Sequence, residues 1–260
     1  MSAAALAGSG RAVHAVPGRG PVAEALRAGR ALREVVLDRR GGTREGALAE
    51  LAEAARSAGV RVRHADRDEL DRLAEGVLHQ GAVALAPAFV YADLDDLPQP
   101  DLVVVLDGIT DPQNLGAIAR SAEAAGAAAL VLPKRRSAHV TPAAEKASAG
   151  AFSHLPVVLV PNIVRLLAEL SARELWSVGL AGEADEPLWT CALLDGPVAL
   201  VIGSEGRGLA RLTAERVDAR MNIPMVGRLG SLNASAAAAI ALFEVRRRRD
   251  ASAVGAAGLG

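Results

Sequence analysis

Three segments of the chain combine polar side chains with turn-forming glycines, and they hold the residues best suited to chemistry. They are LDGITDPQNLGAIARSAEAAGA at 106–127, LVIGSEGRGL at 200–209 and IPMVGRLGSLNASAAAAI at 223–240. Each begins with or follows an apolar run that predicts a buried strand, and the first and third then open an alanine-rich helix. Turns at the carboxyl ends of parallel strands expose backbone N–H and C=O groups to ligands, so we expect the three to meet at one pocket.

Asn114 and Arg120 are the side chains of the first segment that could act on a ligand. The irregular loop 107–114 is predicted to lead into a helix, with Asn114 at its start and Arg120 on its second turn. From there the guanidinium could reach the pocket mouth and bind a phosphate or a ribose-bearing strand. Taken alone, the segment favours a simpler interpretation, an N-cap asparagine followed by a solvated arginine.

The other two segments add a carboxylate and a polar loop. GSEGRG at 203–208 lacks the Lys-Ser/Thr pair of a nucleoside triphosphate loop, and its glycine spacing differs from a dinucleotide fingerprint. Glu205 fits a ribose hydroxyl, an amine or an arginine as partner, although a strand-ending turn explains the motif equally well. Ser231, Asn233 and Ser235 lie where a loop meets the helix predicted over 234–245. They could cap that helix, or the backbone of 223–232 could bind a ligand.

The composition excludes several classes of protein. With 260 residues, 51% hydrophobic residues and a net charge of −1, the chain can bury a core and has no global attraction to nucleic acid. A single cysteine, Cys191, excludes an internal disulfide, and the five histidines lack ligand spacing, so we expect no metal. The start MSAAALAGSG does not resemble a signal peptide, and no long apolar run is present. We therefore expect a cytoplasmic protein without a membrane partner.

Periodicity and breaker residues predict two α/β domains. Residues 1–10 and 250–260 are expected to be disordered tails, 11–87 a compact α/β domain, 88–101 a linker and 102–249 a second domain. Apolar runs in the second domain predict strands at 102–109, 128–133, 154–161, 175–181, 197–204 and 221–226. With helices between most of them, these runs indicate a mainly parallel sheet covered on both faces.

The three segments together resemble the signature motifs of one enzyme family. In order and spacing, N-L-G-A-I-A-R, I-G-S-E-G-R-G-L and I-P-M…S-L-N-A-S are similar to the motifs of the SpoU (TrmH-like) ribose 2′-O-methyltransferases of the SPOUT superfamily. The resemblance covers 102–249, with Ala234 where the family often has Val. Upstream, HAVPGRGPVAEALRAG and LHQGAVA resemble, more weakly, the L30e-like RNA-binding domain of the ribosomal-RNA branch.

This resemblance implies a fold, a methyl donor and an assembly. The fold would be an α/β sheet whose C-terminal chain forms a trefoil knot, the donor S-adenosylmethionine, and the assembly a homodimer. The residues that match the family's catalytic positions are Asn114, Arg120, Glu205 and Asn233. The cofactor-binding positions are Gly203, Ile223, Pro224, Met225, Ser231 and Leu232. The candidate RNA-binding residues are Arg19, His79, Gln80, Lys134 and Arg135.

By the same resemblance, the substrate is a guanosine in large-subunit (23S) ribosomal RNA. Arg120 cannot act as an ordinary base because a guanidinium keeps its proton in proteins. We expect it to clamp a phosphate and stabilise the developing alkoxide, while Glu205 orients Arg120 or the cofactor side and Asn233 holds the loop or the ribose. Alternatives are a tRNA methyltransferase, an antibiotic self-resistance rRNA methyltransferase and a non-catalytic ribosome-assembly factor. A nucleotide-binding dehydrogenase is excluded because no G-x-G-x-x-G follows a first strand.

Overall fold

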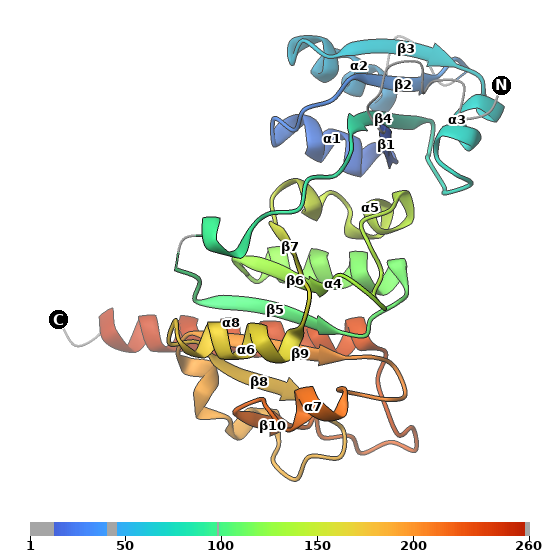
Figure 1. Cartoon of the computed structure of the whole chain (residues 1–260). Coiled ribbons are helices and arrows are strands. Elements are labelled where there is room, and N and C mark those ends of the chain that lie inside the picture. Colours follow the sequence, from blue (N-terminus) through green and yellow to red (C-terminus); the bar gives the residue numbers. More distant parts are fainter. Residues whose placement is uncertain (1–12, 41–45, 98, 258–260) are drawn as a thin grey trace. The chain divides into compact units, whose positions relative to one another are not determined.

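The structure, a computed structural model, describes residues 13–40, 46–97 and 99–257, so the tail predicted over 1–10 lies outside the described residues (Figure 1). The chain divides into two compact units. One comprises the described residues up to Val90 together with His139–His154, and the other comprises Tyr91–Ala138 and the chain from Leu155 onward. The contiguous second domain predicted over 102–249 therefore differs from this division, because residues 139–154 pack with the first unit.

The first unit is a small α/β fold. Its elements are β1 (Val13–Pro17), α1 (Arg19–Arg27), β2 (Glu34–Asp38), α2 (Ala47–Ser57), β3 (Arg61–Ala65), α3 (Arg67–Leu73), β4 (Ala82–Pro87), α5 (Pro142–Ser148) and the 3₁₀ turn η3 (Ala151–Ser153). The strands form one sheet in the order β1-β4-β2-β3, in which β4 is antiparallel to β1 and β2 while β3 is parallel to β2.

Alternating residues of β4 build a core on each face of this sheet. Ala82 and Ala84 pack in one apolar cluster with Leu51 of α2. Val83 and Leu85 belong to a second cluster with Leu70 of α3. Because successive strand side chains point to opposite faces, one short apolar strand can hold helices on both sides.

Helix α5 joins the first unit through a buried carboxylate. Glu145 has no exposed surface. Its Oε1 accepts hydrogen bonds from His14 Nε2 and from Arg30, each at 2.8 Å. The guanidinium of Arg30 also lies over the ring of Phe89, 5.5 Å from its centroid. A carboxylate buried this deeply requires such partners, so these contacts tie the segment 139–154 to β1 and to the chain after α1.

The second unit contains a parallel sheet with helices on both faces. Its elements are η2 (Leu94–Asp96), β5 (Leu102–Asp107), α4 (Pro112–Ala124), β6 (Ala129–Pro133), β7 (Val157–Val160), α6 (Ile163–Ser171), β8 (Trp176–Leu180), η4 (Leu188–Thr190), η5 (Ala192–Asp195), β9 (Val198–Gly203), α7 (Arg211–Ala214), β10 (Ala219–Met221) and α8 (Ala234–Ala257). The order is β10-β8-β9-β5-β6-β7, and every pair is parallel. Figure 1 shows α4 and α8 on one face and α6 on the other. The predicted parallel sheet is confirmed.

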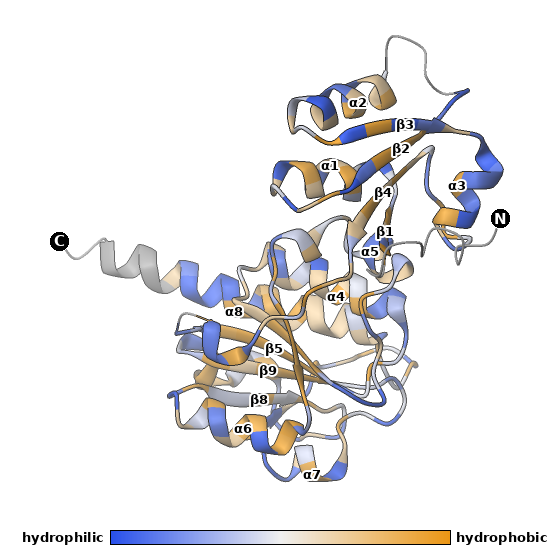
Figure 2. Cartoon of the chain, turned by 45° about the horizontal axis from the view of Figure 1, so that its top comes forward, coloured by the Kyte–Doolittle hydropathy of each residue, from blue (hydrophilic) through white to orange (hydrophobic). Residues whose placement is uncertain are grey.

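The sheet strands are apolar along their length because both faces are covered. Val103 and Val105 of β5 pack in a core cluster with Leu166 and Leu170 of α6. Figure 2 shows the corresponding orange colour along β5 and β9, whereas α6 alternates between apolar and polar residues. The centre of the sheet is therefore fixed by burial, and the polar segments of the sequence follow its strands.

Three boundaries differ from the sequence-based expectation. The strand predicted over 221–226 ends at Met221, and residues 222–233 contain no regular helix or strand. The predicted linker 88–101 contains η2, whose Leu94 is buried in the core of the second unit. Helix α8 continues to Ala257, so the prediction of a disordered tail is wrong over 250–257, while 258–260 lie outside the described residues.

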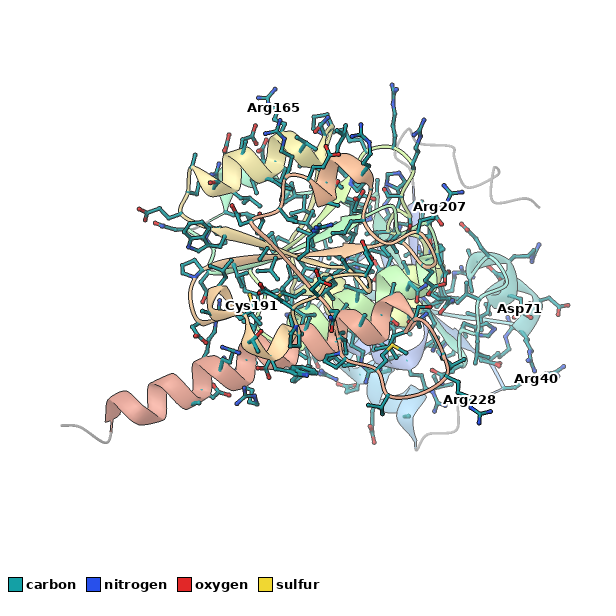
Figure 3. The ribbon with its side chains drawn as sticks, turned by 90° about the horizontal axis from the view of Figure 1, so that it is seen from below. Arg40, Asp71, Arg165, Cys191, Arg207 and Arg228 are labelled. Carbon is teal, nitrogen blue, oxygen red and sulfur yellow. The ribbon has the colours of Figure 1, made fainter. Side chains whose placement is uncertain are left out.

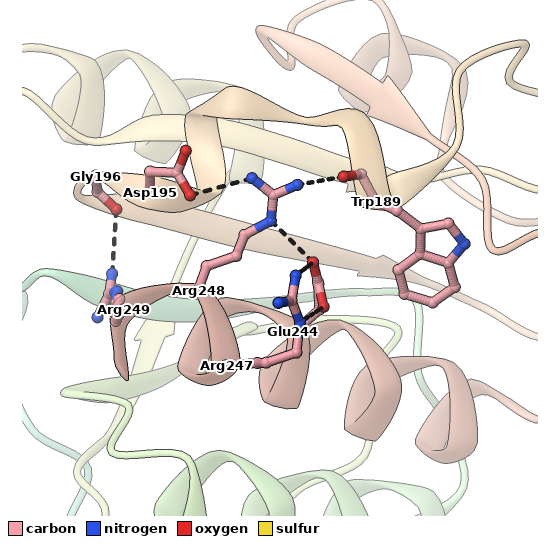
Figure 4. Close-up of polar contacts among 7 residues, drawn as sticks. All are labelled: Trp189, Asp195, Gly196, Glu244, Arg247, Arg248 and Arg249. Atoms are coloured by element: carbon pink, nitrogen blue, oxygen red, sulfur yellow. Dashed lines mark hydrogen bonds and ion pairs between the residues drawn. The ribbon is translucent and has the colours of Figure 1, made fainter. Parts of the chain in front are cut away.

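An arginine run, 246–249, anchors the middle of α8 to the rest of the second unit (Figure 4). Arg248 donates to Glu244 Oε1 at 2.8 Å, to Asp195 Oδ1 at 3.1 Å and to the carbonyl of Trp189. Arg249 donates to Asp101 Oδ2 at 2.9 Å. Hydrogen bonds from Arg247, and then from Arg248, hold the pKa of Glu244 below its ordinary value despite its burial.

We predict that Glu244→Gln lowers the free energy of unfolding by about 1–2 kcal/mol, because charge-assisted hydrogen bonds to two arginines are weakened. With a lowered pKa in the folded state, Glu244 stabilises the protein fully above about pH 4.3. This contribution is lost as the pH falls through the folded-state pKa, and the variant lacks that part of the acid dependence. Denaturant unfolding at neutral and acidic pH measures both effects.

The control is Glu169→Gln, which removes the exposed Glu169–Arg165 pair of α6. That pair should contribute less than about 0.5 kcal/mol. Equal effects of the two substitutions would contradict an anchoring role for Glu244.

Candidate active site

Asn114 lies inside helix α4 rather than at its cap. The helix begins at Pro112, and the side chain of Asp111 caps it by accepting from the N–H of Gln113 at 3.0 Å. Proline at the first helical position fits this start because its missing N–H would have no intrahelical partner. The expectation that Asn114 begins the helix is therefore wrong by two residues. Its side chain is 8% exposed and takes part in a polar cluster.

That cluster joins Asn114, Glu205 and Asn233, which come from the three segments that the sequence singled out. Glu205 Oε1 accepts from Asn114 Nδ2 at 2.8 Å, from Asn233 Nδ2 at 2.5 Å and from the backbone N–H of Ala234 at 3.4 Å. Asn233 Nδ2 also donates to Asn114 Oδ1 at 2.9 Å. Both amide orientations are therefore fixed, and the expected meeting of the three segments is confirmed.

Asn233 has two structural roles at once. While its amide nitrogen faces Glu205, its Oδ1 accepts from the N–H of Ser235 at 2.9 Å and from that of Ala236 at 3.3 Å. These are the contacts of a helix N-cap. The capping interpretation is confirmed, and the cap of α8 is part of the polar cluster.

Glu205 is presented by a tight turn at the end of β9. The N–H of Ser204 donates to the carbonyl of Gly208 at 3.0 Å, and the N–H of Gly208 donates back to Ser204 at 2.9 Å. Past the turn, Asp107 Oδ2 accepts from the N–H of Ala210 at 2.7 Å and ties the exit of the turn to β5. Asp107 was not among the predicted site residues, although its place at the end of a strand in the first motif could have indicated it.

A cavity of about 940 Å³ opens beside this cluster. It is lined by three stretches of chain, 180–187, 202–208 and 221–237, with gaps in the first and third. All six predicted cofactor-binding residues line it: Gly203, Ile223, Pro224, Met225, Ser231 and Leu232. Glu183 and Asp185 add carboxylates to the lining. The cavity thus combines apolar side chains, irregular backbone and a few charges, the usual composition of a small-molecule site.

Arg120 does not pair with Glu205. Its side chain is exposed on α4 and forms no hydrogen bond or ion pair with any residue that the structure describes. Of the two partners suggested for Glu205, Arg120 and the cofactor side, the first is therefore wrong in this structure. Arg207 and Arg228, on the loops that line the cavity, are exposed as well and point outward in Figure 3.

The candidate RNA-binding residues fall into different environments. His79 is 5% exposed; its Nδ1 accepts from the N–H of Gly81 at 3.0 Å and its Nε2 contacts Asp71 Oδ1 at 3.0 Å. Both ring nitrogens are thus engaged, so the prediction that His79 contacts RNA is wrong: it organises a turn. The other candidates, Arg19, Gln80, Lys134 and Arg135, are exposed.

Within the described ranges, no group of three or more His, Cys, Asp or Glu side chains is arranged to hold a metal ion. Cys191 is buried, and burial raises the pKa of its thiol, so the thiolate is disfavoured. No described helix is both long enough and apolar enough to cross a membrane.

We predict that Gly203→Ala disrupts the turn that carries Glu205. A Cβ at this position would lie 2.2 Å from the carbonyl carbon of Gly208 and 2.4 Å from the N of Leu209, both of them backbone atoms. The expected loss of unfolding free energy is about 3 kcal/mol, the upper end for overpacking. Gly182→Ala is the matched control, since Gly182 lines the same cavity and its added Cβ meets nothing within 4 Å. Equal stability of the two variants, measured by thermal unfolding, would refute the argument.

Two family models match separate parts of the chain, and their boundary differs from that of the compact units because residues 139–154 fall within the second match. The SpoU rRNA Methylase family matches residues 101–243, and residues 15–92 match the family described as RNA 2′-O ribose methyltransferase substrate binding. The cavity and the Asn114–Glu205–Asn233 cluster lie within the first match.

Individual relatives cover most of the chain. YacO of Bacillus subtilis, named as a TrmH family tRNA/rRNA methyltransferase, is 40% identical over 90% of this chain and 96% of its own. RlmB of Escherichia coli, a 23S rRNA (guanosine-2′-O-)-methyltransferase, is 43% identical over 78% of this chain and 85% of its own. The SpoU methyltransferase AviRb of Streptomyces viridochromogenes, solved with AdoMet, has a TM-score of 0.77 at 28% identity, covering 95% of this chain and 97% of that one. The chain belongs to the SpoU rRNA methylase family.

Proposed function

We propose that this protein transfers a methyl group from S-adenosylmethionine to the ribose 2′-oxygen of a guanosine in 23S ribosomal RNA. The observation that carries the proposal is the Asn114–Glu205–Asn233 cluster at the edge of the 940 Å³ cavity, in a chain 43% identical to RlmB. RlmB is named for that reaction, and the structure of AviRb was solved in complex with AdoMet. An enzyme with a ribosomal RNA substrate would act in the cytoplasm.

The cavity suits S-adenosylmethionine by its size and by the groups that line it. Ile223 and Leu232 supply apolar surface, and the loop backbone around them supplies N–H and C=O groups of the kind that bind an adenine edge. Glu183 and Asp185 offer carboxylates to a positively charged ligand. When bound, the donor supplies a methyl group on a sulfonium, which is a good leaving group.

The residues of the chain then have to align the acceptor and manage its proton. Arg120 has no partner among the described residues, so its fixed positive charge is available to hold the phosphate beside the target ribose and to stabilise the 2′-oxygen as it loses its proton to phosphate or water. Asn114 and Asn233 hold Glu205 by Oε1. Its Oε2 has no hydrogen bond within the described part of the chain and can accept one from a substrate hydroxyl or amine.

Two further features belong to the proposal. The first is a trefoil knot: the cavity walls come from 180–187, 202–208 and 221–232, and the helix that follows, α8, packs against α4 and β9. The second is a homodimer. Val226, Leu229 and Phe243 are large apolar side chains exposed in the loop before α8 and on α8 itself, and a second copy would cover them.

A methyl-transfer assay tests the function. The purified protein, given S-adenosylmethionine and unmodified 23S rRNA, should form 2′-O-methylguanosine at one position, and calorimetry should show saturable donor binding without binding of NADH. Bulk tRNA is the comparison substrate, because YacO carries a tRNA/rRNA name. Methylation of tRNA alone would show that the substrate is tRNA and not rRNA. The absence of any methylation would overturn the proposal.

We predict that Arg120→Ala lowers the rate of methyl transfer by about 10²–10³-fold, the usual effect of removing one group that stabilises a developing oxyanion. Donor binding should change little, because Arg120 does not line the cavity. Arg165→Ala, which removes another exposed arginine from the same unit, should keep full activity. Loss of donor binding in Arg120→Ala, measured by calorimetry, would contradict the assigned role.

A further inference from the structure

Arg19 and Lys146 lie together in the first unit without a carboxylate. Lys146 Nζ donates to Gln80 Oε1 at 2.8 Å, and neither cation forms an ion pair with an acidic residue in the described ranges. Burial and the nearby charge of Arg19 both lower the pKa of Lys146. Other arginines of this unit do form ion pairs: Arg27, Arg30, Arg56, Arg61 and Arg63 each pair with a glutamate, and Arg67 pairs with Asp71.

The backbone around these two cations is shaped to hold them. Gly18 has φ +109°, and a Cβ there would lie 2.5 Å from Lys146 Nζ, so the ammonium rests against bare backbone beside Arg19. Gln80 has φ +54°, a left-handed conformation that a side-chain-bearing residue rarely adopts. The buried ring of His79 holds that turn through the N–H of Gly81.

Lys146 is placed by its neighbour in the sequence. Glu145 points into the first unit, where His14 and Arg30 bind its carboxylate, and the adjacent Lys146 is left partly exposed on the other side of α5. The side chain of Thr141 caps this helix by accepting from the N–H of Ala144. The position of the ammonium is therefore set by a buried ionic contact. A ligand that binds there would have to order the Lys146 side chain only slightly.

From this arrangement we propose that Arg19, Gln80 and Lys146 form a binding site for a backbone phosphate of the RNA substrate. The inference rests on the proposed function. Two neighbouring cations, one of them partly desolvated, disfavour folding, and a phosphate would compensate both. Since Gln80 Oε1 already accepts a hydrogen bond from Lys146 Nζ, the Gln80 amide nitrogen stays available as a third donor to the phosphate.

The site also crosses the boundary between the two family matches. Arg19 and Gln80 lie in the match to the substrate-binding family, 15–92, whereas Lys146 lies in the SpoU rRNA Methylase match, 101–243. The segment 139–154 therefore completes the RNA-binding surface of the first unit.

Three variants that each lower the net charge of this unit by one test the inference. Lys146→Met removes the ammonium, Gln80→Glu keeps the hydrogen-bond geometry but adds a competing carboxylate, and Arg56→Met is the control, since Arg56 is exposed and paired with Glu53. Affinity for an unmodified 23S rRNA transcript is measured at several salt concentrations, with thermal unfolding of each variant.

We expect Lys146→Met and Gln80→Glu to bind the transcript about tenfold more weakly and to reduce the slope of log affinity against log salt by about 0.7–0.9, the value of one phosphate contact. Both should unfold at the wild-type temperature or above it, because Lys146→Met removes one of the two neighbouring cations and Gln80→Glu gives them a counter-charge. Arg56→Met should bind as the wild type does.

Wild-type affinity in both variants would overturn the inference, and so would a lower unfolding temperature in both, which would indicate a structural role for the cluster. A wild-type protein that neither binds nor methylates 23S rRNA would instead overturn the proposed function, and the phosphate site with it. The methylation assay on the wild type therefore distinguishes the two failures.

Discussion

One carboxylate oxygen, Glu205 Oε1, receives hydrogen bonds from α4, from the side chain that caps α8 and from the first backbone N–H of α8. These elements are separated by about a hundred residues in the sequence, and the carboxylate sets their register at the end of the sheet. A carboxylate that accepts several donors forms stronger hydrogen bonds than a neutral acceptor does. The arrangement of the site depends on this contact, since Glu205 joins the side chain of Asn114 on α4 to the cap of α8.

Other contacts of the second unit hold Glu205 and the cap of α8 in place. The turn of Glu205 can form only because Gly203 lacks a Cβ, and Asp107 fixes the exit of that turn to the neighbouring strand. Near the middle of α8, Arg248, held by Glu244, attaches the helix to η4 and η5. A helix held at its start and near its middle keeps its cap, Asn233, in place. The arginine run 246–249 thus serves mainly the protein's own structure, although its composition resembles that of a nucleic-acid contact.

Much of this fold was predictable from the sequence, because burial fixes it. The apolar runs of β5 and β9 could only be internal strands, and the three polar segments after such strands had to meet at one edge of the sheet. Predictions failed where tertiary contacts determine the local conformation or the environment of a side chain. The run MNIPMV has the composition of a strand, yet only Met221 belongs to one, since the residues that follow line a cavity. His79 matched a motif, but its environment is a buried turn, and no local pattern distinguishes these possibilities.

Lys146 is a residue whose proposed role could not be predicted from the sequence around it. Nothing in PAAEKAS marks the lysine as functional, since a single lysine on a short helix is usually solvated. The position of Lys146 is set by Glu145. The buried carboxylate of Glu145 brings α5 to His14 and Arg30, residues more than a hundred positions earlier. A carboxylate is expensive to bury, so this contact persists only if the packing around it is fixed. The consequence is a cation held beside Arg19 without a counter-charge, and such an imbalance on an RNA-binding unit is best explained by the phosphate of a substrate.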